Sequence, residues 1–137
     1  MLRYVIVSFG SGLLFGVLDA LLNANPLAVK LFAVYKPIAR SSVNPLAGMA
    51  IDIAYGFIMA GIFLLLYQSL PGGSGIVKGL SFGLIAWFFR VVMQAASSWV
   101  MFEVPLPTTA YSLAAGLLEM ILIGLLYGLT LKPFEIQ

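Results

Sequence analysis

Four charged side chains stand inside long apolar stretches of this sequence. They are Asp19, Asp52, Arg90 and Glu119. A charge at the centre of a membrane-spanning helix costs about 2.5 to 3.5 kcal/mol on insertion scales, so such a group pairs with another, meets water or serves a function. Carboxyl groups in a low-dielectric interior are able to carry protons or bind a cation. These residues are therefore the candidate site.

The depths of these residues predict which of them meet. Counted from the membrane side that carries the two long connections, Arg90 and Glu119 lie about 18 and 15 Å deep at 1.5 Å per residue. A short link joins their helices, which favours antiparallel neighbours, so we predict an Arg90–Glu119 ion pair. Asp52 lies about 9 Å deep and Asp19 about 6 Å deep, near a helix end. Three carboxyl groups against one arginine leave acid uncompensated.

Polar residues accompany these charges, but the usual catalytic and metal-binding side chains are missing. Gln94 and Ser97 follow Arg90 within two turns, and Tyr55 follows Asp52 within one turn. The sequence has no Cys and no His, which excludes thiol chemistry and the commonest zinc and haem ligands. Without a histidine base, a serine hydrolase is not supported. We expect no enzyme activity, no bound metal and no cofactor.

The composition predicts an integral membrane protein. Of 137 residues, 62% are hydrophobic and 9% are charged, whereas ordinary soluble domains carry about 25% charged residues. The lipid bilayer is therefore the first expected partner, and a multi-pass location in the cell inner membrane is the expected localisation. The net charge is only +2 with no basic run, so a nucleic-acid partner is not expected.

Four apolar segments are long enough to cross a bilayer. They cover residues 3–23, 46–67, 75–102 and about 108–132. Asn25-Pro26 and Asn44-Pro45 are typical helix starts, with an asparagine cap and a proline in the first position. The first of them opens a short interfacial helix. We predict an all-α membrane protein of four transmembrane helices in two similar hairpins, residues 1–70 with the interfacial helix and residues 75–137, forming one integral membrane domain.

The two halves of the chain match at an offset of 67 residues. Gly12-Leu-Leu-Phe-Gly16 aligns with Gly79-Leu-Ser-Phe-Gly83, and Asp52 aligns with Glu119. This match predicts an internal repeat whose copies share one orientation and are related by an axis along the membrane normal.

Small residues four apart let two helices approach closely. The candidate packing glycines are Gly12, Gly16, Gly48, Gly56, Gly75, Gly79 and Gly83. Those of the first and third spans are predicted to meet each other near the axis.

Two functions from different classes are consistent with these features. The first is a non-enzymatic subunit or scaffold of a membrane complex, in which the intramembrane charges set helix packing. The alternative is a small oligomeric ion- or proton-coupled transporter or channel that uses Asp52 and Glu119. Both predict association, with copies of this chain or with other membrane subunits. Each membrane side carries three basic residues, so the positive-inside rule does not decide the orientation.

Overall fold

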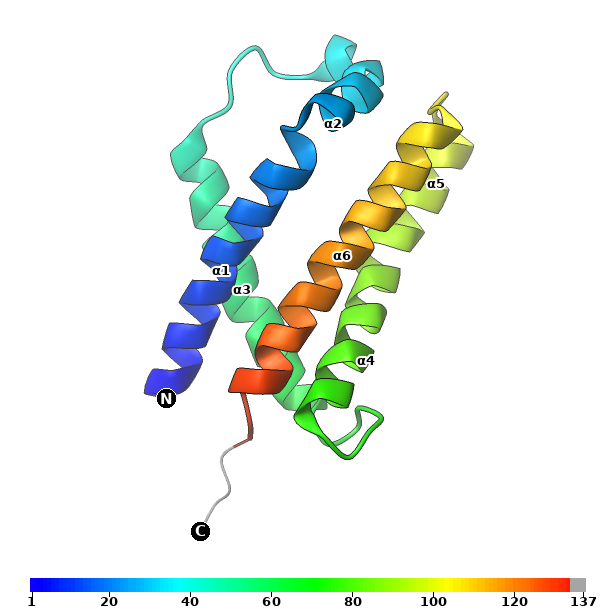
Figure 1. Ribbon diagram of the computed structural model, residues 1–137. Helices are drawn as coiled ribbons and strands as arrows, with labels where there is room; N and C mark the ends of the chain where they lie inside the picture. The colour runs from blue at the N-terminus through cyan, green and yellow to red at the C-terminus, as the bar shows by residue number, and fades with distance from the viewer. Residues whose placement is uncertain (134–137) are drawn as a thin grey trace.

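The computed structural model describes residues 1–133, and these form helices joined by short connections without any strand. Three of the long helices are α1 (Leu2–Asn23), α3 (Pro45–Leu66) and α6 (Leu106–Thr130). The other long segment, Gly75–Met101, comprises α4 (Gly75–Trp87), a π-helical turn η2 (Phe88–Val92) and α5 (Met93–Met101) (Figure 1). All four segments have the length and hydropathy of membrane spans, as a multi-pass membrane protein requires. Residues 134–137 of the predicted second hairpin lie outside the described residues.

Both predicted asparagine caps are present. The Asn25 side chain accepts a hydrogen bond from the Ala28 backbone N–H at 2.9 Å and starts α2 (Pro26–Leu31). The Asn44 side chain accepts from the Leu46 N–H at 3.0 Å and starts α3. The chain continues from α2 into a 3₁₀ helix, η1 (Phe32–Ile38), which extends the predicted short helix. Together α2 and η1 lie across one end of the bundle (Figure 1).

The long helices pack as two close pairs, α1 with α3 and α4 with α6, and α1 also contacts α6. Glycines make both close contacts. A β-carbon at Gly12 would lie 2.5 Å from the Ile53 Cα, and one at Gly83 would lie 2.7 Å from the Met120 carbonyl oxygen. The prediction that the glycines of the first and third spans meet each other is therefore wrong. Small residues show that some helix comes close, and here it is the antiparallel neighbour in the same half of the chain.

Two more of the predicted packing glycines behave differently. A β-carbon at Gly16 would meet side chains only, the nearest atom being Asp52 Oδ2 at 3.3 Å. A β-carbon at Gly48 would meet nothing within 4 Å. The prediction for Gly48 is therefore wrong within this chain, because the residue lies in the first turn of α3, where that helix and α1 have diverged (Figure 1).

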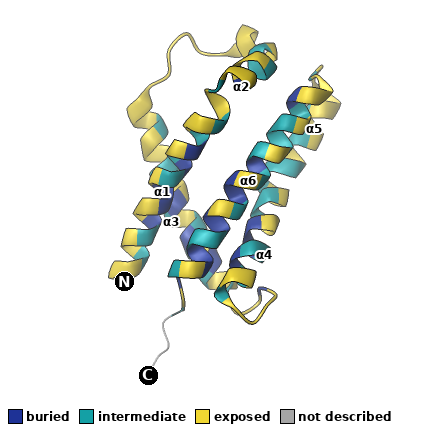
Figure 2. Ribbon diagram, in the orientation of Figure 1, coloured by how far each residue is buried: buried dark blue, intermediate teal, exposed yellow. Residues whose placement is uncertain are grey.

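Burial is concentrated in the half of the bundle that holds the two chain ends (Figure 2). Its aromatic centre is Phe63, whose ring centroid lies 5.3 Å from that of Phe82 and 5.8 Å from that of Tyr127. Other fully buried side chains are Phe15, Ala60, Met120 and Ile123. In contrast, η2 and α5 contain no buried residue. The bundle is thus closed at one end and open toward the end that carries α2.

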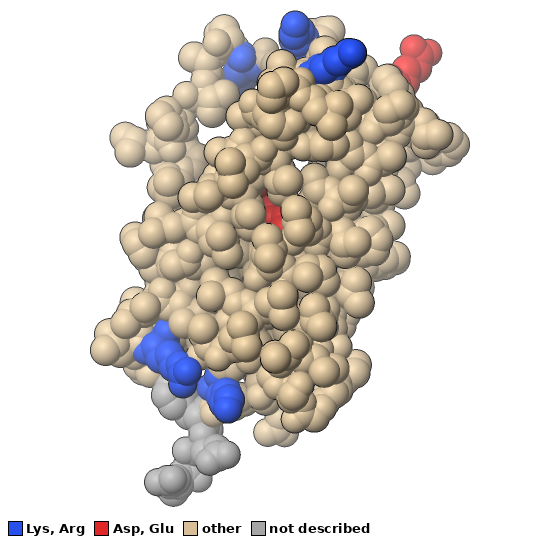
Figure 3. Space-filling model, viewed as in Figure 1, with Lys and Arg blue, Asp and Glu red and all other residues tan. Residues whose placement is uncertain are grey.

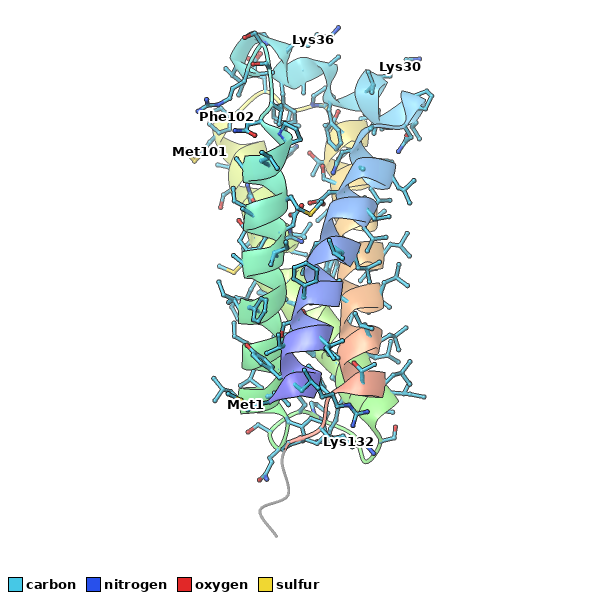
Figure 4. The ribbon with its side chains drawn as sticks, turned by 90° about the vertical axis from the view of Figure 1, so that its left-hand side faces the viewer. Met1, Lys30, Lys36, Met101, Phe102 and Lys132 are labelled. Carbon is cyan, nitrogen blue, oxygen red and sulfur yellow. The ribbon has the colours of Figure 1, made fainter. Side chains whose placement is uncertain are left out.

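Charges mark the two ends of the molecule. Lys30 and Lys36 lie at the α2 end, and Lys132 lies at the opposite end beside Met1 (Figure 4). The belt between them is uncharged on the face shown in Figure 3, except for one acidic side chain seen in a hollow at mid-height. The candidate site lies at this depth.

Candidate functional site

The predicted ion pair is present. Arg90 Nη1 donates a hydrogen bond to Glu119 Oε1 at 3.1 Å. The Glu119 side chain is 8% exposed and the Arg90 side chain is 36% exposed. The acid is thus enclosed by helices, whereas the guanidinium retains open space around it.

The helix geometry changes locally at Arg90, which lies within the π-helical turn η2. Such turns interrupt α-helices frequently at functional sites. Two contacts with α6 are made at this turn, one by the residue just before it and one by a residue within it. The Trp87 indole N–H donates to the Leu113 carbonyl oxygen at 2.9 Å, and Val91 packs on Gly116 so closely that a β-carbon there would lie 2.6 Å from it. Gly116 therefore leaves the room that the wider turn needs.

The Arg90 guanidinium also contacts the other helix pair. Its central carbon lies 5.2 Å from the ring centroid of Phe15 on α1 and 5.8 Å from that of Tyr55 on α3. Both distances fall within the range of cation–π attraction. Arg90 is therefore held by a carboxylate of its own helix pair and by two aromatic rings of the other.

The two aspartates complete the cluster. The Asp52 carboxylate points toward α1, because its Oδ2 atom lies 3.3 Å from the position that a Gly16 β-carbon would take. Asp19 lies on α1 one helical turn after Phe15, whose ring contacts Arg90. The four charged residues singled out in the sequence thus come from all four spans, one from each.

A polar cavity of about 270 Å³ adjoins this cluster. Its lining runs from Tyr35 and Val104 near the α2 end to Arg90 and Glu119 in mid-span. The ion pair therefore lies at the inner end of the cavity. Further polar lining residues are Asn23, Gln94, Ser98, Thr109 and Ser112.

The predicted polar neighbours of the charges lie in different surroundings. Gln94 lines the cavity and Tyr55 faces Arg90, as described above. Ser97 is exposed and does not line the cavity, because it lies about 100° around the helix from its neighbour Ser98, which does. Gln94 and Ser98 are four residues apart and therefore share one face of the helix. This spacing was the sequence signal that favoured Ser98 over Ser97 as a neighbour of Gln94.

An apolar groove of about 530 Å³ lies between α3 and α4. Its lining is almost entirely hydrophobic, with Ile58 and Ile62 on one wall and Ile85 and Phe89 on the other. Arg90 lines both the groove and the polar cavity. The guanidinium therefore separates a polar space from an apolar one.

Hydroxyl groups that the sequence did not single out join the two pairs away from the cluster. The Tyr127 hydroxyl donates to Ser11 Oγ at 2.9 Å and lies 3.2 Å from the Gly56 carbonyl oxygen, so α6 is tied to both α1 and α3. At the α2 end, Thr108 Oγ1 donates to the Leu31 carbonyl oxygen at 2.7 Å. Nothing in the sequence distinguished these hydroxyls from others in the apolar spans.

No family model, no curated protein and no solved structure matches this chain. Among residues 1–133, no group of three acidic side chains is arranged to hold a metal ion.

Proposed function

We propose that the protein is a small, non-enzymatic membrane transporter of the cell inner membrane that binds a proton or another cation at Glu119 and Asp52. The observation that carries this proposal is the position of the Arg90–Glu119 pair of the charged cluster at the inner end of a polar cavity. Charges that serve only to hold helices together need no such access. Three acids against one arginine leave negative charge for a cation to neutralise.

The buried core supports access from one side of the membrane. Beyond the ion pair, the path toward the chain ends is filled by Phe15, Met120 and Ile123, each no more than 1% exposed. A cation that enters from the α2 end therefore meets a closed core. Transport requires a second arrangement of the helices in which this core opens and the cavity closes, as in other carriers with a central site.

Flux measurements in liposomes test the proposal. The purified protein should carry protons or a monovalent cation down an imposed gradient, and Glu119→Gln or Asp52→Asn should reduce the rate by at least about tenfold. Glu103→Gln is the matched control, because Glu103 is an exposed acid near the α2 end and lies outside the cluster. Wild-type flux in both cluster variants, with normal insertion and assembly, contradicts the proposal.

A second candidate is the subunit or scaffold role, and the uncovered groove between α3 and α4 favours it. Ile58 and Phe89 on its walls are 57% and 66% exposed, and a partner helix would cover them. Gentle purification from the original host distinguishes the two roles. Other subunits at fixed stoichiometry support the subunit role, whereas a homo-oligomer supports the transporter.

We also infer that the two helix pairs derive from one duplicated hairpin. The offset of 67 residues places Asp52 on Glu119, and both acids belong to the same cluster. An ancestral hairpin had to insert and associate by itself, so residues 1–70 expressed alone should form a dimer in the membrane. A fragment that stays monomeric speaks against this origin.

A further inference from the structure

The surroundings of the Arg90 guanidinium are those of a binding site for an organic cation. A carboxylate oxygen lies 3.1 Å from one of its nitrogens. The Phe15 and Tyr55 rings lie 5.2 and 5.8 Å from its central carbon. Aromatic faces beside a carboxylate are the groups that recognise substituted ammonium ions. In this structure, the arginine of the chain itself takes the cation's place.

The two hollow spaces that meet at Arg90 extend this site. The polar cavity gives a route from the α2 end, and the groove of about 530 Å³ has the volume of a small-molecule site. Apart from Arg90 and the Tyr55 hydroxyl, the groove is lined by apolar side chains. A ligand that fills it therefore has an apolar body and places any charge beside Arg90.

The net charge of the cluster determines whether the ligand should be positively or negatively charged. Asp19, Asp52 and Glu119 oppose Arg90 alone, so two negative charges are in excess when all four groups are ionised. A cation entering this low-dielectric region is attracted, whereas an anionic headgroup is repelled. Charge complementarity thus favours a positively charged occupant over an acidic lipid.

We propose that the junction of the polar cavity and the groove binds an amphipathic organic cation. Its charged head takes the place of the Arg90 guanidinium between the Phe15 and Tyr55 rings and the carboxylates, and its apolar body lies in the groove between α3 and α4. This inference rests on the proposed transport function, because it names the class of substrate for the same site.

Arg90 acts in this site as a tethered competitor. Its side chain is 36% exposed and borders the polar cavity, so it has space into which to withdraw when a ligand arrives. Loss of its charge leaves the carboxylates and the rings without a cation. Arg90→Gln should therefore raise the affinity for the ligand, which a purely structural ion pair would not predict.

The experiment measures binding of tetraphenylphosphonium to the purified full-length protein in nanodiscs of zwitterionic lipid, against empty nanodiscs. Tetraphenylborate is the matched probe, because it has the same shape and the opposite charge. We expect saturable binding of the cation, at least about tenfold tighter binding in Arg90→Gln, and at least about tenfold weaker binding in Asp52→Asn. Saturable binding of both probes with equal affinity overturns the proposal, because the groove then selects apolar shape alone.

A pair of tryptophan substitutions on one helix tests the groove. Ile58→Trp fills it and should weaken cation binding by at least about tenfold, whereas Leu65→Trp, at an 84% exposed position outside the groove, should not. Thermal unfolding of each variant shows that it is folded. Unchanged binding in a folded Ile58→Trp overturns the proposed location.

The failure of this inference differs from the failure of the proposed function. If Glu119-dependent flux is present but tetraphenylphosphonium does not bind, the substrate class is wrong and the transport function stands. If the cation binds as described but flux is the same in Glu119→Gln and Asp52→Asn, the transport function is wrong.

Discussion

The α4/α6 pair and the α1/α3 pair both rely on glycine, but they use it differently. Five glycines meet backbone atoms of the opposite helix in the second pair: Gly75, Gly79, Gly83, Gly124 and Gly128. Only Gly12 and Gly56 do so in the first pair, and Gly16 there faces side chains of Asp52 and Met49. The second pair is therefore a rigid backbone-to-backbone contact, whereas the first has side chains in its interface that are able to move.

The two pairs also differ in register. Gly12 faces Ile53 and Gly56, whereas Gly79 faces Gly124 and Gly128. At the offset of 67 residues, Gly79 corresponds to Gly12, but its partners correspond to positions one helical turn further along α3. Similar sequences thus pack about one turn apart in the two pairs.

A third difference concerns the contacts between the pairs. A strict two-fold relation would repeat the α1–α6 contact between α4 and α3. Instead, α3 and α4 meet through the Phe63 and Phe82 rings at one end, and the apolar groove separates them further along. The groove of the proposed ligand site thus lies where a strict two-fold relation would have brought α3 and α4 together.

Glycine-to-alanine substitutions should have the largest effect on stability, and this effect should differ between the rigid α4/α6 pair and the more adaptable α1/α3 pair. Gly79→Ala places a β-carbon inside the van der Waals distance of the Gly124 carbonyl oxygen. Because backbone cannot yield easily, we expect a loss of about 1 to 3 kcal/mol in unfolding free energy, as for other overpacked sites. Gly16→Ala should cost less, because only side chains must shift. Thermal unfolding in mild detergent measures both.

Gly48→Ala is the control for this prediction, because its β-carbon meets open space. We expect no loss of stability from it, and a gain of up to about 1 kcal/mol is reasonable because alanine favours helix over glycine. A Gly16→Ala variant that loses more stability than Gly79→Ala contradicts the distinction between the pairs.

Tyr127→Phe should loosen the joint between the pairs with a smaller effect. It removes the hydroxyl that donates to Ser11 Oγ and lies 3.2 Å from the Gly56 carbonyl oxygen, and the lost hydrogen bond is worth about 0.5 to 1.5 kcal/mol. Combination with Ser11→Ala forms a double-mutant cycle, measured by unfolding in detergent. We expect the two effects to be less than additive, and strict additivity would show that this bond does not couple α6 to α1.

Ser8→Ala should have the smallest effect. Ser8 Oγ is fully buried in α1 and has no hydrogen-bond partner among the described residues. Removal of an unpaired buried hydroxyl relieves a desolvation cost, so unfolding free energy should stay the same or rise by about 1 kcal/mol. A marked loss of stability would show that the hydroxyl has a partner, such as a bound water.

The sequence was sufficient for the features that depend on one residue or on depth. Asparagine before proline predicted both helix caps. The asparagine side chain accepts a hydrogen bond from a free backbone N–H of the first turn, and proline lacks the N–H that would have no partner there. Depth along two joined spans predicted the Arg90–Glu119 pair, because the rise per residue is fixed.

Other features depend on which helices meet, and local patterns do not hold that information. The glycines showed that helices approach closely, yet not that Gly79 faces Gly124 on its own neighbour. The π-helical turn at Arg90 has no proline or glycine within it to mark it. The groove exists because α3 and α4 do not pack against each other along their whole length. No single residue of the sequence indicates where two helices fail to pack.

The π-helical turn has a genetic consequence. It contains one more residue per turn than an α-helix would, so deletion of a single codon between Phe88 and Val92 should restore a uniform helix. All later residues of the span, including Gln94 and Ser98, would then keep their orientation relative to the glycines before the turn, because the wide turn accommodates the extra residue within itself. Deletion of a codon elsewhere in the span, outside this turn, would instead rotate all residues that follow it by about 100° relative to those before it.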